Sequence, residues 1–337
     1  DEVGTTGGYV VSYPASLDFF KNVALYWIDS YEIDGWRFDQ AYQLSEGYSR
    51  NYWIDMRQAV ETKCAARKAA GCQWGTLGYM VGEIWRGEYD IKRYGYGTDS
   101  EKGLPSCFDF PLRYSLVQVL AREEYNAYTD LRSSAGNLHL GFTTHTAYPS
   151  FAQPNLMLTN HDLVRFGNLI LQAYGYGSEN AQYWARHRAA ISFMAAFTGP
   201  ITLYYGDEIG DYLPGYLKNS DLGYYNDHVA RSNGIISGFN TNQQALHDYV
   251  ATLMKLKAAH PDLWRGKRTN LNCIGSMYAD LKTDTTSGEK LVYVLNAGTS
   301  SSSATLSVSG ATKLTRIPLA DTESADEYPG TGSFTVS

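Results

Sequence analysis

Two patterns of apolar residues alternate along the chain up to about residue 265. In one, apolar residues recur every three or four positions over a long segment, as on the buried face of an amphipathic helix. This pattern predicts helices at residues 17–31, 52–70, 111–123, 181–197 and 243–259. The other pattern consists of short apolar runs, which predict strands at residues 33–39, 77–84, 106–110, 155–160 and 201–205. Strands that alternate with longer helices are typical of β/α units around a parallel sheet.

From about Lys267 the pattern changes to short apolar segments separated by Gly, Ser, Thr and Asp. These segments predict strands at residues 274–278, 291–295, 304–308 and 313–317. Closely spaced strands without intervening helices favour an antiparallel sheet. We therefore predict two domains: a β/α portion over residues 1–266 and a small antiparallel β-sandwich domain over residues 267–337.

The composition indicates a folded globular protein, because 44% of the 337 residues are hydrophobic and 19% are charged. The longest nearly apolar segment, residues 189–197, is far shorter than a membrane span, so we expect no membrane association. Lys and Arg number 28 against 35 Asp and Glu, which gives a net charge of −7. No basic run stands out, and this argues against binding of nucleic acid.

Aromatic residues are abundant, with 28 Tyr, 7 Trp and 12 Phe. Amphipathic rings suit a surface that stacks on sugars, although packing in a core is the commoner explanation for any one ring. The four cysteines show no Cys-x-x-Cys spacing, which argues against a zinc site. Cys64 and Cys72 are close enough in sequence to form a disulfide. Cys107 and Cys273 are predicted to be buried free thiols. Few Lys and many Tyr, Thr, Ser and Asn favour a secreted or periplasmic protein.

The first candidate for chemistry is the segment from Asp34 to Asp39, which ends a predicted strand. Arg37 and Asp39 are two positions apart, so their side chains share one face of the strand. A guanidinium beside a carboxylate keeps it ionised and oriented, as a carboxylate nucleophile requires. An ordinary buried ion pair is an equally good explanation of this segment alone.

Two further strands end in polar residues. Glu83 closes an apolar strand beside Trp85, where loss of solvent would raise the pKa of its carboxyl group and suit it to act as a general acid. Asn160, His161 and Asp162 follow the strand predicted at 155–160. Taken singly, a Glu at a strand end usually meets water, and Asn-His-Asp reads as a turn with an Asx cap.

The three segments together are more informative than each alone. In parallel β/α folds the active site lies at the carboxyl ends of the strands, and each candidate acid follows a separate strand. Paired carboxylates with aromatic platforms are typical of glycosidases. No glycine-rich phosphate loop, Ser-His-Asp elbow or metal-ligating His cluster competes with this interpretation.

These segments resemble the short sequence blocks of the α-amylase family of glycoside hydrolases. The resemblance rests on Asp34–Asp39, Gly82-Glu83, Asn160–Asp162 and residues 199–208, which match the blocks at strands four, five, seven and eight of that family's barrel. It implies a (β/α)8 TIM barrel, of which this chain carries about strands 4–8. Five units alone would leave an exposed parallel edge. We therefore expect a missing N-terminal segment or chain to complete the barrel.

The resemblance also implies roles for individual residues. Asp39 would be the nucleophile and Arg37 its positioning partner. Glu83 would be the general acid/base, and Asp162 would grip sugar hydroxyls, with His161 and Asn160 beside it binding substrate. The implied reaction is retaining hydrolysis of α-glucosidic bonds in starch-like α-glucans or maltooligosaccharides, through a covalent glucosyl-enzyme.

The chain departs from the family pattern after the nucleophile, where Tyr42 and Gln43 stand in place of Lys and His. Those two residues serve the acceptor side, and the His carbonyl often meets calcium. This chain lacks that His and so lacks the residue that often supplies this calcium ligand. The resemblance still implies Ca2+, with most of its ligands outside this chain. Tyr42, Gln43 and Trp85 are candidate substrate-binding residues, and packing at the barrel rim is the alternative for the two rings. The altered acceptor side keeps open an α-glucan transglycosylase, for example a cyclodextrin-forming one. A non-catalytic binding relative is disfavoured, because all three acids are present.

Overall fold

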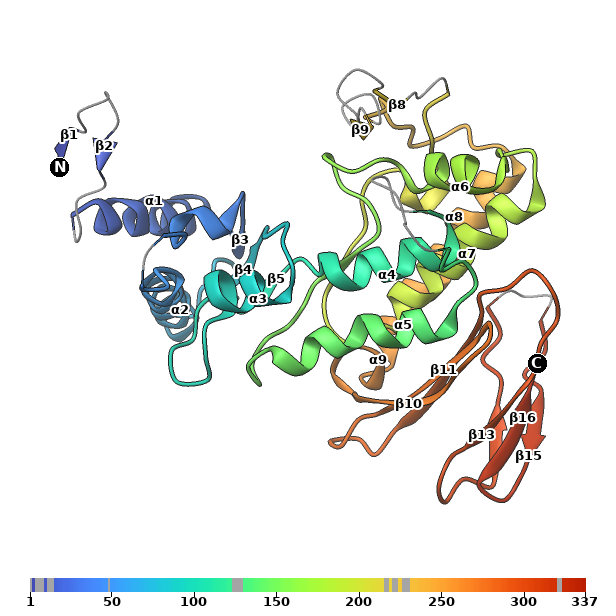
Figure 1. The fold of residues 1–337 in the computed structure, drawn as a ribbon. Helices are drawn as coiled ribbons and strands as arrows, with labels where there is room; N and C mark the ends of the chain where they lie inside the picture. The colour runs from blue at the N-terminus through green and yellow to red at the C-terminus, as the bar shows by residue number, and fades with distance from the viewer. Residues whose placement is uncertain are drawn as a thin grey trace. The chain divides into compact units, whose positions relative to one another are not determined.

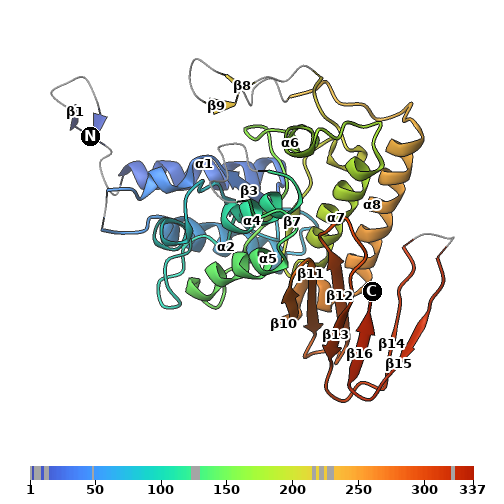
Figure 2. The ribbon, with the colours of Figure 1, turned by 45° about the vertical axis from the view of Figure 1, so that its right-hand side comes forward.

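The structure, a computed structural model, describes residues 2–3, 9–10, 15–47, 49–122, 130–214, 218–219, 224–225, 231–319 and 323–337. Two compact units make up the chain (Figures 1 and 2). The first comprises residues 1–108 and 147–154, and the second comprises residues 109–146 and 155–337. The boundary expected between residues 266 and 267 lies within the second unit, where it separates mostly helical residues from antiparallel strands. That it divides two domains stays a prediction.

A three-stranded parallel sheet lies in the first unit. Its strands are β3 (Gly35–Phe38), β4 (Tyr79–Gly82) and β5 (Ser106–Cys107), hydrogen-bonded in that order. Phe38 pairs with Gly82, and Gly82 pairs with Cys107. The three strands therefore end level with one another, and the residues that follow β3 and β4 meet at the same edge of the sheet.

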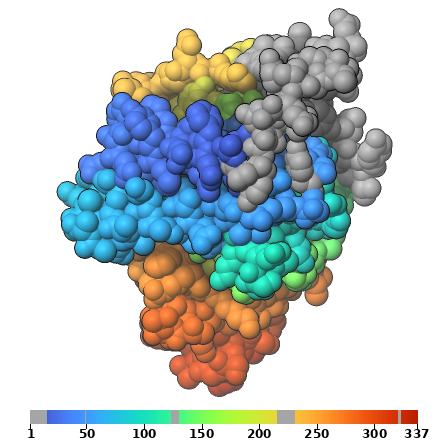
Figure 3. Space-filling view, turned by 90° about the vertical axis from the view of Figure 1, so that its left-hand side faces the viewer, coloured from blue at the N-terminus to red at the C-terminus, as the bar shows by residue number. Residues whose placement is uncertain are grey.

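Two long helices, α1 (Ala15–Tyr31) and α2 (Trp53–Ala69), pack against each other in this unit (Figure 3). Their apolar faces bury Ile28, Met56 and Val60 completely. The indole of Trp53 donates a hydrogen bond to the carbonyl of Ala41 at 2.8 Å. This bond ties the start of α2 to the segment that follows β3, where the candidate nucleophile lies. The shorter elements are β1 (Glu2–Val3), β2 (Tyr9–Val10), η1 (Ala41–Leu44), α3 (Glu88–Asp90) and η2 (Ile91–Tyr96).

Gly82, the last residue of β4, allows a close approach between the ends of β3 and β4. A Cβ atom at this position would lie 2.4 Å from Leu104 Cδ1 and 3.0 Å from Ala41 Cβ. Real side chains do not tolerate the shorter of these contacts, so Leu104 would have to move. The absence of a side chain at Gly82 therefore leaves room for Leu104 and for Ala41, which lies two positions after Asp39.

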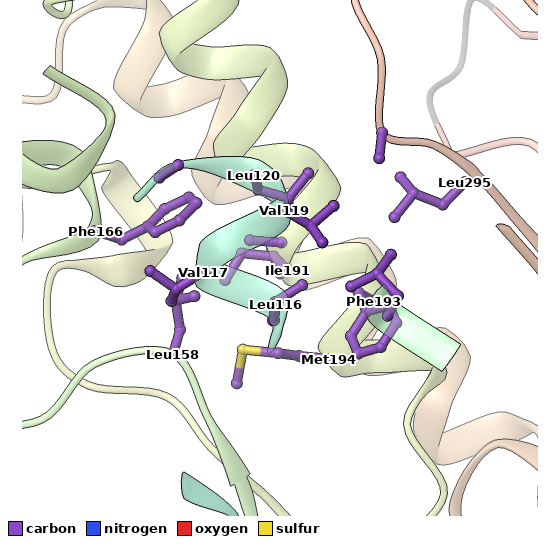
Figure 4. Close-up of a cluster of buried hydrophobic side chains, with 14 of the residues drawn as sticks. Leu116, Val117, Val119, Leu120, Leu158, Phe166, Ile191, Phe193, Met194 and Leu295 are labelled. Carbon is purple, nitrogen blue, oxygen red and sulfur yellow. The ribbon is translucent and has the colours of Figure 1, made fainter. Parts of the chain in front are cut away.

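The second unit contains a parallel strand pair, β6 (Leu156–Met157) and β7 (Ile201–Thr202). Its helices are α4 (Phe110–Leu120), α5 (Ala135–Gly141), η3 (Phe142–Ala147), α6 (Phe166–Tyr174), α7 (Ala181–Ala196), η4 (Asp207–Ile209), α8 (Thr241–Ala259) and α9 (Asp262–Arg265). Figure 4 shows part of the core shared by α4, α5, α6, α7 and α8, where Leu116 of α4 lies beside Ile191 and Met194 of α7. Leu295 belongs to the same cluster, so the C-terminal sheet packs on these helices.

The C-terminal residues form antiparallel sheets, as the sequence predicts. Three strands, β10 (Lys267–Ile274), β11 (Met277–Thr283) and β12 (Lys290–Asn296), form one sheet. Two further pairs join β13 (Ala304–Ser307) to β16 (Ser333–Val336) and β14 (Lys313–Thr315) to β15 (Glu327–Pro329). A short pair, β8 (Lys218–Asn219) and β9 (Tyr224–Tyr225), precedes α8.

The predicted helices are confirmed, with ends that differ by a few residues. The helix expected at 111–123 begins at Phe110 and ends at Leu120, and residue 123 lies outside the described residues. The strand expected at 106–110 ends at Cys107, because Asp109 caps α4 by accepting a hydrogen bond from the Leu112 amide at 3.1 Å. None of the described helices combines the length and the apolar character that a membrane crossing requires.

The strand predicted at 274–278 is wrong, because a turn between β10 and β11 divides it. Gly275 has a φ of 60° at this turn, a conformation that glycine adopts without strain. All four cysteines are free thiols, so the spacing of Cys64 and Cys72 does not produce a disulfide. Cys107 is buried as expected, whereas Cys273 is only partly buried.

A fully buried histidine on α7 makes the folded state sensitive to acid. His187 is 1% exposed, neither ring nitrogen has a hydrogen-bond partner in the described structure, and burial lowers its pKa to about 3. Between the ordinary pKa of about 6.5 and pH 3 the unfolded chain binds more protons than the folded one. We expect the free energy of unfolding to fall by up to about 1.4 kcal/mol per pH unit in this range from His187 alone. Urea unfolding from pH 7 to pH 4 measures the slope.

The variant His187→Leu should flatten this slope, since leucine has no proton to gain. The control His247→Gln changes an exposed histidine on α8 and should leave the slope as in the parent protein. Parallel curves for the parent and His187→Leu would remove His187 as the source of the acid sensitivity.

Candidate active site

The end of β3 places a carboxylate and a guanidinium side by side, as the spacing predicts. Arg37 Nη1 lies 2.5 Å from Asp39 Oδ1, and the Asp39 side chain is 69% exposed. The same guanidinium reaches Glu83, with Nη2 at 3.1 Å from Oε2. Arg37 therefore contacts both candidate acids of the first unit, one through each terminal nitrogen. An isolated ion pair between Arg37 and Asp39 would not account for the second contact, with Glu83.

Glu83 follows β4 and is almost completely buried, with only 4% of its surface exposed. Burial raises the pKa of its carboxyl group, and the nearby Asp39 carboxyl raises it further. The charge of Arg37 and a hydrogen bond from the Gln40 amide oppose this rise in the pKa. Its second oxygen, Oε1, is buried and receives no hydrogen bond within the described structure. Glu83 thus has the environment that the sequence predicts for a general acid.

Gln40 contributes through its backbone, which the sequence did not indicate. Its amide donates a hydrogen bond to Glu83 Oε2 at 3.3 Å. Gln40 adopts a left-handed conformation, with a φ of 38° and a ψ of 48°, which is unfavourable for a residue other than glycine. The surrounding contacts hold it there: the Ala41 amide donates to the Glu83 carbonyl at 2.7 Å, and the Glu83 amide donates to the Phe38 carbonyl at 2.9 Å. Backbone strain of this kind is concentrated at functional sites.

Tyr42 and Gln43, the residues that depart from the family pattern, lie on η1 directly after this segment. The Arg86 guanidinium lies over the Tyr42 ring, 4.4 Å from its centroid. Interaction with Arg86 lowers the pKa of the Tyr42 hydroxyl. The Gln43 side chain donates to the side chain of Gln40. Trp85, which lies two positions after Glu83, is partly buried. The Tyr42 ring thus has one cation on its face.

The third candidate acid belongs to the second unit, where it follows β6. Asp162 accepts one hydrogen bond from Arg231 at 2.9 Å, and His161 Nε2 lies 3.2 Å from its other oxygen. Its amide bonds Asn160 Oδ1 at 2.8 Å, which confirms the expected Asx turn. Arg231 also donates to the His161 carbonyl at 2.5 Å. Sequence reasoning missed Arg231, because it lies 69 positions after Asp162 and no motif surrounds it.

The segment at residues 199–208 places a buried acid beside this turn. Asp207 is 3% exposed, and burial raises its pKa to about 7. Thr159, which follows β6, donates its hydroxyl to Asp207 Oδ1 at 2.6 Å. Arg165, with 1% of its side chain exposed, lowers the pKa of Asp207 through its charge and packs on the rings of Tyr204 and Tyr205. These contacts join the residues after β6 to those after β7.

The structure therefore brings Asp39, Glu83 and Arg37 together in the first unit and groups Asn160, His161 and Asp162 in the second. In the first group, an exposed carboxylate held by arginine lies near a buried carboxyl whose pKa is raised. Such a pair can divide the tasks of nucleophile and proton donor. The roles of the individual residues stay predictions.

Comparisons with known proteins place the sequence in a family. Residues 14–265 match the family described as the catalytic domain of alpha amylase. A cyclomaltodextrinase from Thermoanaerobacter pseudethanolicus is 23% identical over 84% of this chain, which spans 40% of that protein. An intracellular maltogenic amylase from Bacillus subtilis is 24% identical over 85% of this chain, again spanning 40% of that protein. The chain thus spans less than half the length of these curated relatives.

Solved structures resemble the chain over almost its whole length. Crystal structures of AmyP in complex with maltose and of an AmyP variant in complex with maltotriose are 38% identical in sequence. The TM-scores are 0.82 and 0.84, and each match covers 99% of this chain and 69% of the other. The expected fold, part of a (β/α)8 barrel followed by an antiparallel β domain, is confirmed by these matches.

Proposed function

Since the chain belongs to the α-amylase family of glycoside hydrolases, we propose that it carries the catalytic acids of a retaining glycosidase that cleaves α-glucosidic bonds. The substrates in this proposal are starch-like α-glucans or maltooligosaccharides. The observation that carries the proposal is the Arg37 guanidinium, which contacts both Asp39 and Glu83. Proximity of the two carboxyl groups is what a retaining glycosidase requires, whereas an inverting one needs room for water between them.

In the first step, Glu83 donates its proton to the glycosidic oxygen as the bond to the anomeric carbon breaks. Asp39 forms the new bond to that carbon, and the leaving sugar departs with a hydroxyl group. In the second step, Glu83 removes a proton from water, and the water oxygen displaces Asp39 from the anomeric carbon. The raised pKa of Glu83 supports its role as donor, and the Arg37 contact supports Asp39 as an ionised nucleophile.

Asp162 takes the role of binding sugar hydroxyls in this proposal, with His161 and Asn160 beside it. Arg231 donates a hydrogen bond to one of its carboxylate oxygens, and the His161 ring lies 3.2 Å from the other. A carboxylate held in this way can accept hydrogen bonds from two neighbouring hydroxyls of a sugar. These hydrogen bonds strengthen as charge develops in the transition state.

Maltooligosaccharides are the substrates best supported by the relatives, since the solved structures show AmyP bound to maltose and an AmyP variant bound to maltotriose. Transfer to a second sugar instead of water remains the competing outcome. It is favoured by Tyr42 and Gln43, which replace the acceptor-side Lys and His of the family pattern. Incubation with maltotriose separates the two outcomes, because only transfer gives products longer than the substrate.

Calcium and the secreted or periplasmic location stay expectations. The described residues contain one group of three side chains whose ligand atoms lie close enough for a metal ion, namely His260, Asp262 and Glu289. Calcium takes oxygen ligands, so a group with an imidazole does not fit it.

The stereochemistry of the product tests the proposal. We expect proton NMR of a fresh reaction with maltotriose to show the α-anomer of the new reducing end before mutarotation supplies the β-anomer. A sample of α-maltose without enzyme gives the rate of mutarotation. Initial appearance of the β-anomer would mean inversion and would remove Asp39 from the role of nucleophile.

A further inference from the structure

Three ligating side chains meet where the last helices of the second unit join the C-terminal sheet. His260 caps the end of α8, Asp262 begins α9, and Glu289 immediately precedes β12. One ligand atom from each lies within 4.8 Å of the others. α9 contacts β11 and β12, which brings these distant parts of the sequence together. His260 Nδ1 lies 2.5 Å from Glu289 Oε1.

Asp262 is the unusual member of this cluster. Its surface is 0% exposed, and both carboxylate oxygens are buried without a hydrogen-bond partner in the described structure. A buried carboxylate with neither oxygen satisfied is costly, and it stands next to a second carboxylate that repels it. An ion that both carboxylates can bind would remove this cost.

The neighbouring basic side chains make their contacts elsewhere. Lys257 donates to the carbonyls of Ala195 and Leu263, the latter at 2.9 Å. Arg265 pairs with Asp284 at 2.8 Å. Lys282 is buried and pairs with Asp280 at 3.7 Å, although Asp262 is close enough to influence its pKa.

We propose that His260, Asp262 and Glu289 bind a divalent transition-metal ion of the zinc class. Two carboxylates and a neutral imidazole supply two negative charges and a mixed set of nitrogen and oxygen ligands, which suits Zn²⁺ better than calcium or magnesium. Three protein ligands leave a fourth tetrahedral position for water. The side chains of His260 and Glu289 are 28% and 33% exposed, so the ion can enter from their side.

The ion would have a structural role and would take no part in a reaction. It would replace the hydrogen bond between His260 and Glu289 and supply the missing partner of Asp262. In this way it would hold the α8–α9 junction against the start of β12. Sequence motifs do not reveal the site, because the ligands follow no known spacing and come from three separate elements. Ligands must be deprotonated to bind, so binding should release protons and weaken at acidic pH.

The test is calorimetric titration of the purified, chelator-treated protein with ZnCl2. We expect one equivalent to bind and the melting temperature to rise with the bound ion. Glu289→Gln and His260→Gln, which change partly exposed side chains, should each raise the dissociation constant at least tenfold. Asp262→Asn removes the buried charge, so it should abolish the zinc-dependent rise in melting temperature while the metal-free protein still folds. The control His247→Gln, a histidine on the same helix outside the cluster, should bind zinc as the parent does.

Two results would overturn the proposal. One is the absence of stoichiometric zinc binding to the parent protein. In that case the cluster would hold a proton shared between Asp262 and Glu289 instead of a metal ion. The other is zinc binding that persists unchanged in both Glu289→Gln and His260→Gln, which would place the ion at other residues. Neither result bears on hydrolysis of glucosidic bonds, so the metal site and the proposed function can fail separately.

Discussion

Replacing Asp39 with asparagine is expected to lower kcat for maltotriose on the order of 10⁵-fold, the largest effect of any substitution considered. Loss of a catalytic nucleophile in other hydrolases costs this much, because the covalent route is removed entirely. Asparagine keeps the size of the side chain and can still accept a hydrogen bond from Arg37. The Asp39 side chain is 69% exposed, so its replacement should leave the melting temperature almost unchanged. Steady-state rates and thermal unfolding measure the two effects.

The matched control is Asp55→Asn on α2, which breaks another Arg–Asp pair of the first unit. Asp55 pairs with Arg50 at 2.6 Å and belongs to no part of the candidate site. This variant should retain the parent rate. If Asp39→Asn keeps more than a tenth of the parent rate, Asp39 is not the nucleophile and the assignment from Arg37 contacts is wrong.

Replacing Glu83 with glutamine should lower kcat/KM for maltotriose by about 10²–10⁴-fold, the range for loss of a general acid. The loss should be much smaller for an aryl maltoside, whose leaving group needs little help from a proton. Glu83 must be protonated in the first step, and burial raises its pKa. The parent rate should therefore persist as pH rises past the ordinary range of glutamic acid and fall only as Glu83 loses its proton. Glutamine has no such proton, so the alkaline fall should disappear.

Profiles of kcat/KM against pH for both substrates measure this effect. The control Glu61→Gln removes a surface carboxylate that pairs with Arg57 on α2, and its profile should follow the parent. If kcat/KM of Glu83→Gln still falls at alkaline pH, another group causes this fall. That result would contradict the role of Glu83 as proton donor.

Periodicity was enough to find the long helices of this fold, because a buried face repeats over several turns. The helix with Met56 and Val60 is an example, since both side chains are fully buried. Short or polar elements escaped prediction. β10 has the sequence Lys-Arg-Thr-Asn-Leu-Asn-Cys-Ile, in which polar side chains outnumber apolar ones, and its pairing with β11 is what makes it a strand. Such elements depend on contacts with partners that a local pattern does not record.

The residues of the candidate site likewise fall into those that the sequence reveals and those that it does not. Side chains that perform chemistry stand out by their type and their position at strand ends, as Asp39 and Glu83 do. Groups that act through the backbone or across a long separation do not. Gln40 contributes an amide, which every residue except proline has, and Arg231 reaches Asp162 from 69 positions away. His260, Asp262 and Glu289 escaped for the same reason, because only folding brings them together.

The position of Arg37 between two carboxyl groups has a consequence for the whole catalytic cycle. Before the proposed reaction the anion is on Asp39 and Glu83 is neutral, whereas in the glucosyl-enzyme Asp39 is an uncharged ester and Glu83 is the anion. Arg37 contacts both, so one fixed cation faces one anion at each stage and the sum of the three charges stays zero. No counter-ion needs to enter or leave as the negative charge migrates, and the dipoles around it need little rearrangement.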